Sequence, residues 1–107
     1  MRLKDKVAIV TGGAHGMGAS EARLFTAEGA KVIVADILET DAEMVAADIR
    51  AGGEEATAAK IDVTSEADWI GLITKGMAIY GRLDILASRA LSRSAASWPG
   101  RRFLSER

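Results

Sequence analysis

Near its start the chain carries an apolar run of strand length that leads directly into a glycine-rich turn. The run spans Val7–Thr11 and the turn spans Gly12–Gly18, with glycines at its first, fifth and seventh positions. A strand buried in a parallel sheet reads as a continuous apolar run, and glycines let the backbone bend sharply and approach a phosphate closely. The residues after Gly16 can then begin a helix whose free N–H groups face the phosphate. This feature predicts a nucleotide-binding strand–turn–helix unit.

Three segments with helical periodicity follow the glycine turn or lie further along the chain. Two starts are predicted at Thr40 and Ser65, each three residues before an acidic residue, which is the spacing of a capping box. Two stops are predicted at Gly29 and at the pair Gly52-Gly53. The expected core faces are Gly18, Ala22, Phe25 and Gly29; Ala42, Val45, Ala46 and Ile49; and Trp69, Leu72, Ile73, Gly76 and Tyr80.

Strand-like runs alternate with these helices at residues 31–35, 56–61 and 81–86. Alternation of strands and helices through short connections favours a parallel sheet, and right-handed crossovers restrict its topology. We therefore predict an α/β fold of the doubly wound, Rossmann type, N-terminal half only, with strand order 3-2-1-4. The first two helices should cover one face and the third should lie on the other. The fourth strand should be an unpaired edge through which the chain could self-associate.

Asp36 ends the second apolar run and lies 18 residues beyond Gly18. An acidic residue about 20 positions after the glycines, at the tip of the second strand, can accept hydrogen bonds from the ribose hydroxyls of NAD. The same carboxylate would repel a 2′-phosphate, and the next residue, Ile37, is not basic. We therefore expect NAD rather than NADP. The alternative for Asp36 is a solvated aspartate at a strand end.

The glycine spacing, Gly-x3-Gly-x-Gly, differs from the common Gly-x-Gly-x-x-Gly fingerprint and resembles that of the short-chain dehydrogenase/reductase family. Asp62-Val63, after the third strand, resembles the pair that borders the adenine ring in the family. Asp62 could equally belong to a turn that leads into a helix. Residues 81–86 resemble the family's entry into its fourth strand, but the family's Asn-Asn-Ala-Gly is replaced after Ala87 by Ser88-Arg89-Ala90-Leu91. The resemblance thus covers residues 1 to about 87.

The residues expected to bind the coenzyme come from these motifs. They are Gly12, His15, Gly16, Met17, Gly18, Asp36, Ile37, Asp62 and Val63. A basic residue at the position of His15 often accompanies NADP in the family, but a neutral imidazole is a poor substitute. Flavin binding is a second possibility. A P-loop is excluded, because no Gly-Lys-Ser/Thr follows the turn.

Catalysis in the family depends on a Tyr-x3-Lys motif and a serine, which interconvert a secondary alcohol and a ketone with the nicotinamide. The chain has one tyrosine, Tyr80, and the residue four positions later is Asp84. We therefore expect no catalytic residue here. The resemblance implies an NAD-dependent short-chain oxidoreductase, acting on a hydroxysteroid or cyclic alcohol, that is truncated before its catalytic residues. The alternative is a non-catalytic nucleotide-binding or interaction module, which would show no turnover.

Composition changes near Ser88. Residues 1–87 hold nine basic and 14 acidic residues, whereas residues 88–107 hold five arginines and one glutamate. We expect two parts, a nucleotide-binding unit at 1–87 and an irregular Arg/Ser-rich tail at 88–107, either solvated or read out of frame. A nucleic-acid arm is a weaker possibility in an acidic protein. The chain has no cysteine, one histidine and no membrane-spanning run, so we expect no metal site, no membrane partner and a cytoplasmic location.

Overall fold

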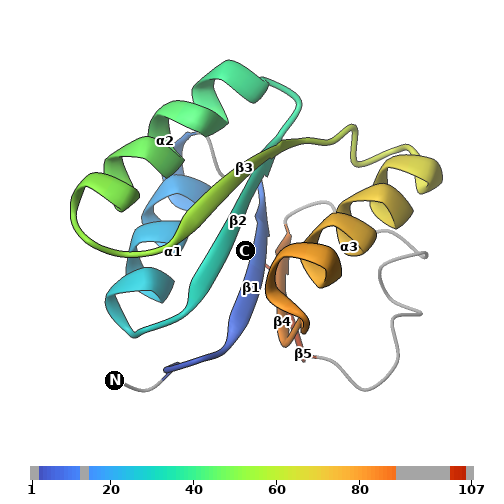
Figure 1. The fold of residues 1–107 in the computed structure, drawn as a ribbon. Coiled ribbons are helices and arrows are strands. Elements are labelled where there is room, and N and C mark those ends of the chain that lie inside the picture. Colours follow the sequence, from blue (N-terminus) through green and yellow to red (C-terminus); the bar gives the residue numbers. More distant parts are fainter. Residues whose placement is uncertain (1–2, 13–14, 89–101, 106–107) are drawn as a thin grey trace.

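The computed structural model describes residues 3–12, 15–88 and 102–105, which form one parallel sheet with helices on both faces (Figure 1). The sheet has the order β3-β2-β1-β4-β5. Its strands are β1 (Val7–Thr11), β2 (Lys31–Asp36), β3 (Ala56–Lys60), β4 (Ile85–Ser88) and β5 (Arg102–Ser105). The helices are α1 (Gly16–Ala27), α2 (Glu39–Ala51) and α3 (Glu66–Tyr80). The predicted fold class and the order 3-2-1-4 are confirmed.

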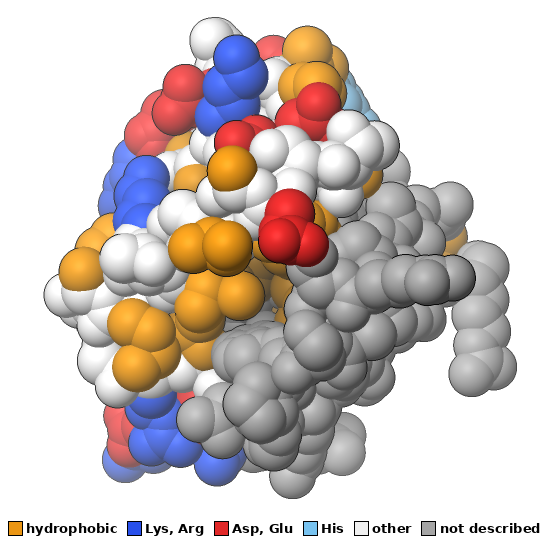
Figure 2. All heavy atoms as spheres, turned by 90° about the vertical axis from the view of Figure 1, so that its right-hand side faces the viewer, with side chains coloured by type: hydrophobic (Ala, Val, Ile, Leu, Met, Phe, Trp, Pro, Cys, Tyr) orange, Lys and Arg blue, Asp and Glu red, His pale blue; other side chains and the backbone are white. Residues whose placement is uncertain are grey.

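The helices divide between the two faces of the sheet as the alternation of strand side chains requires. On one face, Ala8 and Val10 of β1 pack with the buried residues of α1 and α2. On the other face, Val7 and Ile9 pack with Trp69 and the rest of the buried stripe of α3. The arrangement confirms that α1 and α2 share one face and that α3 lies on the other (Figure 1). The side that bears α3 exposes hydrophobic side chains, including Ile70, Met77 and Ile79 of that helix (Figure 2).

Most of the expected helix signals hold. Ser65 caps α3, because its Oγ accepts a hydrogen bond from the backbone N–H of Asp68 at 3.2 Å. Gly29 and Gly53, just beyond the ends of α1 and α2, have positive φ angles of 97° and 92°. Such angles suit glycine after a helix end.

The predicted cap at Thr40 is wrong. Helix α2 begins at Glu39 with Leu38 as its N-cap, so Thr40 lies inside the first turn. The physical reason is the aspartate that ends β2: the Asp36 carboxylate accepts a hydrogen bond from the Leu38 N–H at 3.1 Å. This short turn brings Leu38 directly to the helix start, and the Leu38 carbonyl accepts from Ala42 N–H at 3.0 Å.

The expectation of an irregular tail is wrong at residues 102–105, which form β5. This strand pairs in parallel with β4, for example Leu86 with Phe103 and Ala87 with Leu104. The fourth strand is therefore not an unpaired edge, and self-association through it is not supported. The four residues Arg102–Ser105 have no strand periodicity of their own, so only their pairing with β4 reveals the strand. Ser88, the first residue of the expected tail, instead ends β4. The rest of the tail, including Arg89 and Leu91, lies outside the described residues.

Candidate nucleotide-binding site

The predicted binding residues gather at one edge of the sheet, because the carboxyl ends of parallel strands all point the same way. Thr11 of β1 is in register with Ala35 of β2, so Gly12 follows β1 where Asp36 ends β2. Asp36 is in turn in register with Lys60 of β3, two residues before Asp62. The topology therefore places these three sequence-predicted positions on neighbouring strands at this edge, which we call the carboxyl edge.

The glycine turn between β1 and α1 has the backbone that its sequence requires. Gly12 and Gly16 have φ angles of +67° and +55°, a region that other residues adopt with strain. A Cβ built on either glycine would meet no heavy atom within 4 Å. The turn therefore has open space beside it. Gly13 and Ala14 lie outside the described residues.

The first turn of α1 differs from those of the other two helices. His15 is its N-cap but forms no side-chain capping hydrogen bond, and the first turn contains no acidic residue. By contrast, α2 has Glu39 and Asp41 in its first turn, and α3 is capped by Ser65. The N–H groups and the positive dipole end of α1 thus suit a pyrophosphate. Together with the open glycine turn, these features fit the phosphates of a dinucleotide.

The remaining glycine-turn residues, at the start of α1, differ in their exposure. Gly18 is buried, consistent with close packing of the helix on the sheet. Met17 is half exposed. His15 Nε2 lies 2.9 Å from Asp41 Oδ2, and the His15 side chain is 65% exposed. This contact joins the start of α1 to the first turn of α2.

Asp36 lies at the tip of β2 and is partly buried. Its Oδ1 accepts the hydrogen bond from Leu38 N–H described above. The neighbouring Ile37 is 56% exposed and is followed by the equally exposed Leu38. The aspartate therefore belongs to a turn at the strand end, and its carboxylate is at the carboxyl edge. These two features are compatible.

Asp62 forms the turn that we considered as an alternative. Its Oδ1 accepts hydrogen bonds from the Thr64 hydroxyl at 2.6 Å and from the Thr64 N–H at 2.9 Å. These bonds, the hydroxyl first, lower the pKa of the Asp62 carboxyl. The Val63 carbonyl accepts from the indole Nε1 of Trp69 at 2.9 Å, which holds the turn against α3. The turn is confirmed, and contact with an adenine ring stays a prediction.

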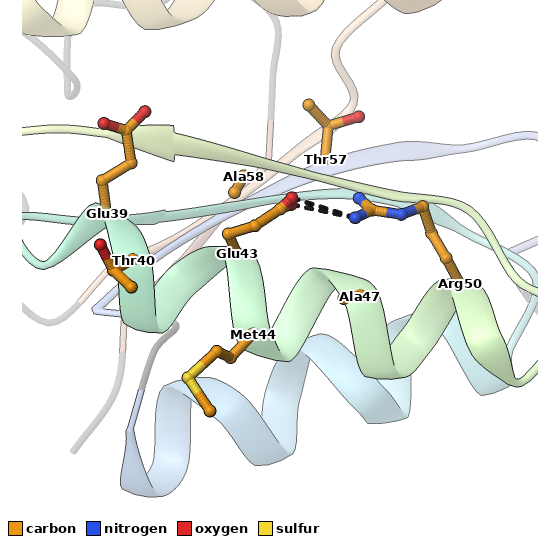
Figure 3. Close-up of a pocket in the computed structure, with 8 residues that line it drawn as sticks. All are labelled: Glu39, Thr40, Glu43, Met44, Ala47, Arg50, Thr57 and Ala58. Carbon is orange, nitrogen blue, oxygen red and sulfur yellow. Dashed lines mark hydrogen bonds and ion pairs between the residues drawn. The ribbon is translucent and has the colours of Figure 1, made fainter.

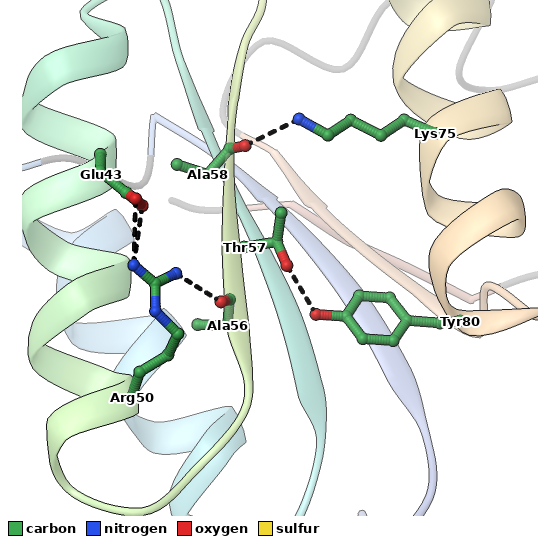
Figure 4. Close-up of polar contacts among 7 residues, drawn as sticks. All are labelled: Glu43, Arg50, Ala56, Thr57, Ala58, Lys75 and Tyr80. Carbon is green, nitrogen blue, oxygen red and sulfur yellow. Dashed lines mark hydrogen bonds and ion pairs between the residues drawn. The ribbon is translucent and has the colours of Figure 1, made fainter.

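Tyr80 lies far from the carboxyl edge. Its hydroxyl is 2.9 Å from the Thr57 hydroxyl, near the amino end of β3 (Figure 4). Its ring packs against the core on the α3 side. Because Thr57 precedes Asp62 by five residues, and a strand rises about 3.3 Å per residue, Tyr80 is roughly 15 Å from that end. This tyrosine therefore cannot reach a nicotinamide bound at the carboxyl edge.

Sequence reasoning missed a residue beside the glycine turn and a groove elsewhere. Thr11 is buried, and its hydroxyl donates to the Ala87 carbonyl at 3.4 Å, joining the ends of β1 and β4. Its position directly before Gly12 was the available signal. A groove of about 580 Å³ lies between α2 and β3 (Figure 3). None of the predicted binding residues lines it, so its size does not mark the carboxyl edge.

Two kinds of feature are absent from the described part of the chain. No helix there is long and apolar enough to cross a membrane. No group of three His, Cys, Asp or Glu side chains there is placed to hold a metal ion. The cytoplasmic location stays a prediction.

Comparison with known proteins gives a consistent family. Residues 6–96 match the model of the short chain dehydrogenase family. The match therefore continues past residue 87, where we expected the resemblance to end.

Similar proteins include two dehydrogenases whose names give different substrates. The chain is 44% identical over 89 residues to the 2,5-dichloro-2,5-cyclohexadiene-1,4-diol dehydrogenase LinX of Sphingobium indicum, covering 83% of this chain and 36% of the relative. It is 42% identical over 89 residues to the 3-alpha-(or 20-beta)-hydroxysteroid dehydrogenase of Mycobacterium bovis, covering 83% and 33%. The chain thus spans about a third of the length of these curated relatives.

A solved structure resembles the fold of this chain. The crystal structure of a hydroxysteroid dehydrogenase from Escherichia coli superposes with a TM-score of 0.79 at 37% identity, covering 81% of this chain and 36% of that one. These two shares are close to those covered by the two sequence matches described above.

Proposed function

Because the chain belongs to the short-chain dehydrogenase family, we propose that its carboxyl edge binds the adenosine diphosphate half of a nicotinamide coenzyme. The glycine turn and the first turn of α1 would hold the pyrophosphate, with Gly12, Gly16, Met17 and Gly18 as backbone contacts. Support comes from the positive φ angles of Gly12 and Gly16, the open space beside them and the uncapped start of α1. When bound, the coenzyme would supply hydride transfer.

The coenzyme we propose is NAD rather than NADP. The observation that supports NAD is the position of the Asp36 carboxylate. This carboxylate stands at the tip of β2, across from Gly12, where the adenosine ribose would lie. A carboxylate accepts hydrogen bonds from ribose hydroxyls and repels a 2′-phosphate. The exposed Ile37 beside it brings no positive charge. His15, the one basic group at the turn, is already in contact with Asp41.

Asp62 and Val63 would border the adenine ring. The Asp62 side chain is a carboxylate at neutral pH, as an aspartate ordinarily is, and it can accept a hydrogen bond from an exocyclic amine. Its Oδ1 already accepts two bonds from Thr64, and a carboxylate oxygen pair offers further acceptor positions. The turn and the adenine contact are therefore compatible.

A titration of the 107-residue chain with NADH and NADPH tests the coenzyme assignment. We expect NADH to bind more tightly, and Asp36→Ala to weaken NADH binding about tenfold, the loss expected for hydrogen bonds to a charged group. Asp48→Ala removes an equally negative, exposed side chain from α2 and serves as the matched control. Tighter binding of NADPH, or equal losses in both variants, would contradict the assignment.

The reaction class we propose for the enzyme to which this coenzyme-binding unit belongs is the interconversion of a secondary alcohol and a ketone. The alcohol would be of the hydroxysteroid or cyclic alcohol type. The support is what the relatives are, one a hydroxysteroid dehydrogenase and one a cyclohexadienediol dehydrogenase. We expect no turnover by this chain alone, because its one tyrosine, Tyr80, is hydrogen-bonded to Thr57 near the amino end of β3. Tyr80 therefore does not serve as the acid or base.

A non-catalytic nucleotide-binding module is the second candidate, favoured by the same position of Tyr80. Incubating the chain with NAD and cyclohexanol or a 3-hydroxysteroid tests whether the chain alone lacks catalysis, which both candidates require. We expect no absorbance of NADH to develop even where NADH binding is measured. Turnover by the chain alone would show that a catalytic residue lies among these 107.

A further inference from the structure

The outer edge of β3 is the edge of the described sheet next to α2 and α3. The N–H and C=O groups of successive β3 residues point alternately toward β2 and away from it. Val32 N–H donates to the Glu55 carbonyl, and Ile61 N–H donates to the Asp36 carbonyl. Because the N–H and C=O of one strand residue point to the same side and alternate along the strand, Ala56 and Ala58 point away from β2. Outward carbonyls of this kind are a template for another strand.

The sequence of β3 contains little that would protect this edge. The strand reads Ala-Thr-Ala-Ala-Lys, with no proline and with its one charge at the last position. Proteins commonly protect such edges with charged side chains, proline, bulges or a covering element. Protection of Ala56 and Ala58 must therefore come from outside the strand.

Two cationic side chains supply it from opposite faces of the sheet (Figure 4). Arg50 of α2 donates from Nη1 to the Ala56 carbonyl at 2.8 Å. Lys75 of α3 donates from Nζ to the Ala58 carbonyl at 3.0 Å. Of the three outward carbonyls of the strand, those of Ala56, Ala58 and Lys60, the first two are thus occupied by side chains that reach across from neighbouring helices.

Arg50 is itself held in place. Its Nη2 donates to both carboxylate oxygens of Glu43 at 3.0 Å, two helical turns earlier on α2. A planar guanidinium bonded at two points loses much of its rotational freedom. Glu43 is therefore a positioning residue for the contact between Arg50 and Ala56. The pair borders the groove of Figure 3 without filling it.

We propose that Arg50 and Lys75 close the outer edge of β3, and that a second copy of this chain pairs with that edge when they are removed. The partner strand is β3 of the second copy, running antiparallel about a two-fold axis, because an isologous contact presents the same edge on both sides. The short, small side chains of β3 offer no steric obstacle to such pairing. None of the residues involved belongs to the carboxyl edge, so the proposal is independent of coenzyme binding.

The test compares two double variants of the 107-residue chain by sedimentation velocity over a range of concentrations. Arg50→Ala with Lys75→Ala frees both carbonyls, and we expect its association constant to rise about tenfold or more, since each freed carbonyl allows a further hydrogen bond between strands. Lys4→Ala with Arg23→Ala removes the same charge, and Arg23 contacts Asp48 rather than β3. Equal sedimentation of both variants would overturn the proposal.

A second measurement locates the contact. Hydrogen exchange at the amides of Ala56 and Ala58 should slow as the concentration of the Arg50→Ala/Lys75→Ala variant rises. Adding Ala58→Pro should restore the sedimentation of the control, because proline removes an outward N–H and leaves the bonds to β2 intact. If association is instead accompanied by lost protection along β1, the variant has unfolded and the edge is not the contact. The Glu43→Gln substitution should raise the association constant less than Arg50→Ala does.

Discussion

At the amino ends of the strands, side chains tie together segments that are distant in the sequence, whereas at the carboxyl ends they mostly bond within their own turns. Asp84, just before β4, accepts a hydrogen bond from Val7 N–H at 2.9 Å across 77 residues. It also accepts two hydrogen bonds from Arg82 at 2.8 Å. At the carboxyl edge, Asp36 bonds to Leu38 and Asp62 bonds to Thr64.

This difference separates stability from binding. A turn whose side chain bonds to its own backbone keeps its shape without contacts to distant strands. Its remaining polar groups are then available to a ligand. The amino ends of the strands, which we call the amino edge, are instead tied together across the sheet. We therefore expect substitutions at the amino edge to lower the free energy of unfolding, and substitutions at the carboxyl edge to change binding with little effect on stability.

The largest effect expected at the amino edge is that of Asp84→Ala. The substitution leaves the N–H of the buried Val7 without its side-chain acceptor and Arg82 without its partner. We expect the free energy of unfolding to fall by about 2 kcal/mol, measured by urea denaturation. Asp48→Ala, which breaks only an exposed contact with Arg23 at 3.4 Å, should cost less than about 0.5 kcal/mol. Equal costs would show that the hydrogen bonds of Asp84 contribute no more to stability than an exposed contact.

Gly76→Ala tests the packing of α3 beside the amino edge. A Cβ at this position would lie 2.8 Å from Leu83 Cδ2 and 2.9 Å from Ile33 Cδ1, both buried side chains. We expect a loss of about 1 to 2 kcal/mol in thermal or urea denaturation. Gly71→Ala in the same helix meets nothing within 4 Å and should stabilise the fold by about 0.5 kcal/mol or more. A stabilising Gly76→Ala would mean that Leu83 moves aside freely.

The pH dependence of stability should also depend on Asp84. The hydrogen bonds from Arg82, together with that from Val7 N–H, lower the pKa of this carboxyl below its ordinary value. A lowered folded-state pKa gives stability that is present above the unfolded pKa of about 3.9 and is lost as the pH falls through the folded value. The stability difference between the unaltered chain and Asp84→Asn should therefore shrink below about pH 4. Denaturation at pH 7, 5 and 3 measures it, and a constant difference would contradict the assignment.

The smallest effect is expected at the carboxyl edge. Thr64→Val removes the hydroxyl that bonds to Asp62, and Thr64 is exposed. We expect the free energy of unfolding to change by less than about 0.5 kcal/mol. The pKa of Asp62 should rise toward its ordinary value, as followed by NMR titration, while that of Asp84 stays unchanged. A stability loss as large as that of Asp84→Ala would show that both edges support the fold.

Local sequence signals predicted much of the fold because their causes are local. Gly12 and Gly16 adopt positive φ, and Ser65 caps α3, each for a reason contained within a few residues. The cap at Thr40 failed because the Asp36 turn starts α2 earlier, and a spacing rule does not include the preceding strand end. The strand at 102–105 was missed because a short run among arginines is defined by its pairing with β4 rather than by its own pattern.

The candidate site was predicted in part. The strand ends, the glycine turn and the two aspartates follow from the alternation of apolar runs with helices, since parallel strands must end at one edge. The ties across the sheet were not predicted: Asp84 with Val7, Tyr80 with Thr57, and Arg50 with Ala56. Each joins residues whose separation in the sequence carries no periodic signal.

The sequence by itself therefore determined the order of elements, the faces that the helices bury and the edge at which a nucleotide would bind, because periodicity, glycine conformation and capping act over short distances. Only the tertiary structure decided which distant side chains meet and which strand edges are closed. Those contacts depend on strand register and on the packing of whole helices against the sheet, where one shift of register would replace every partner.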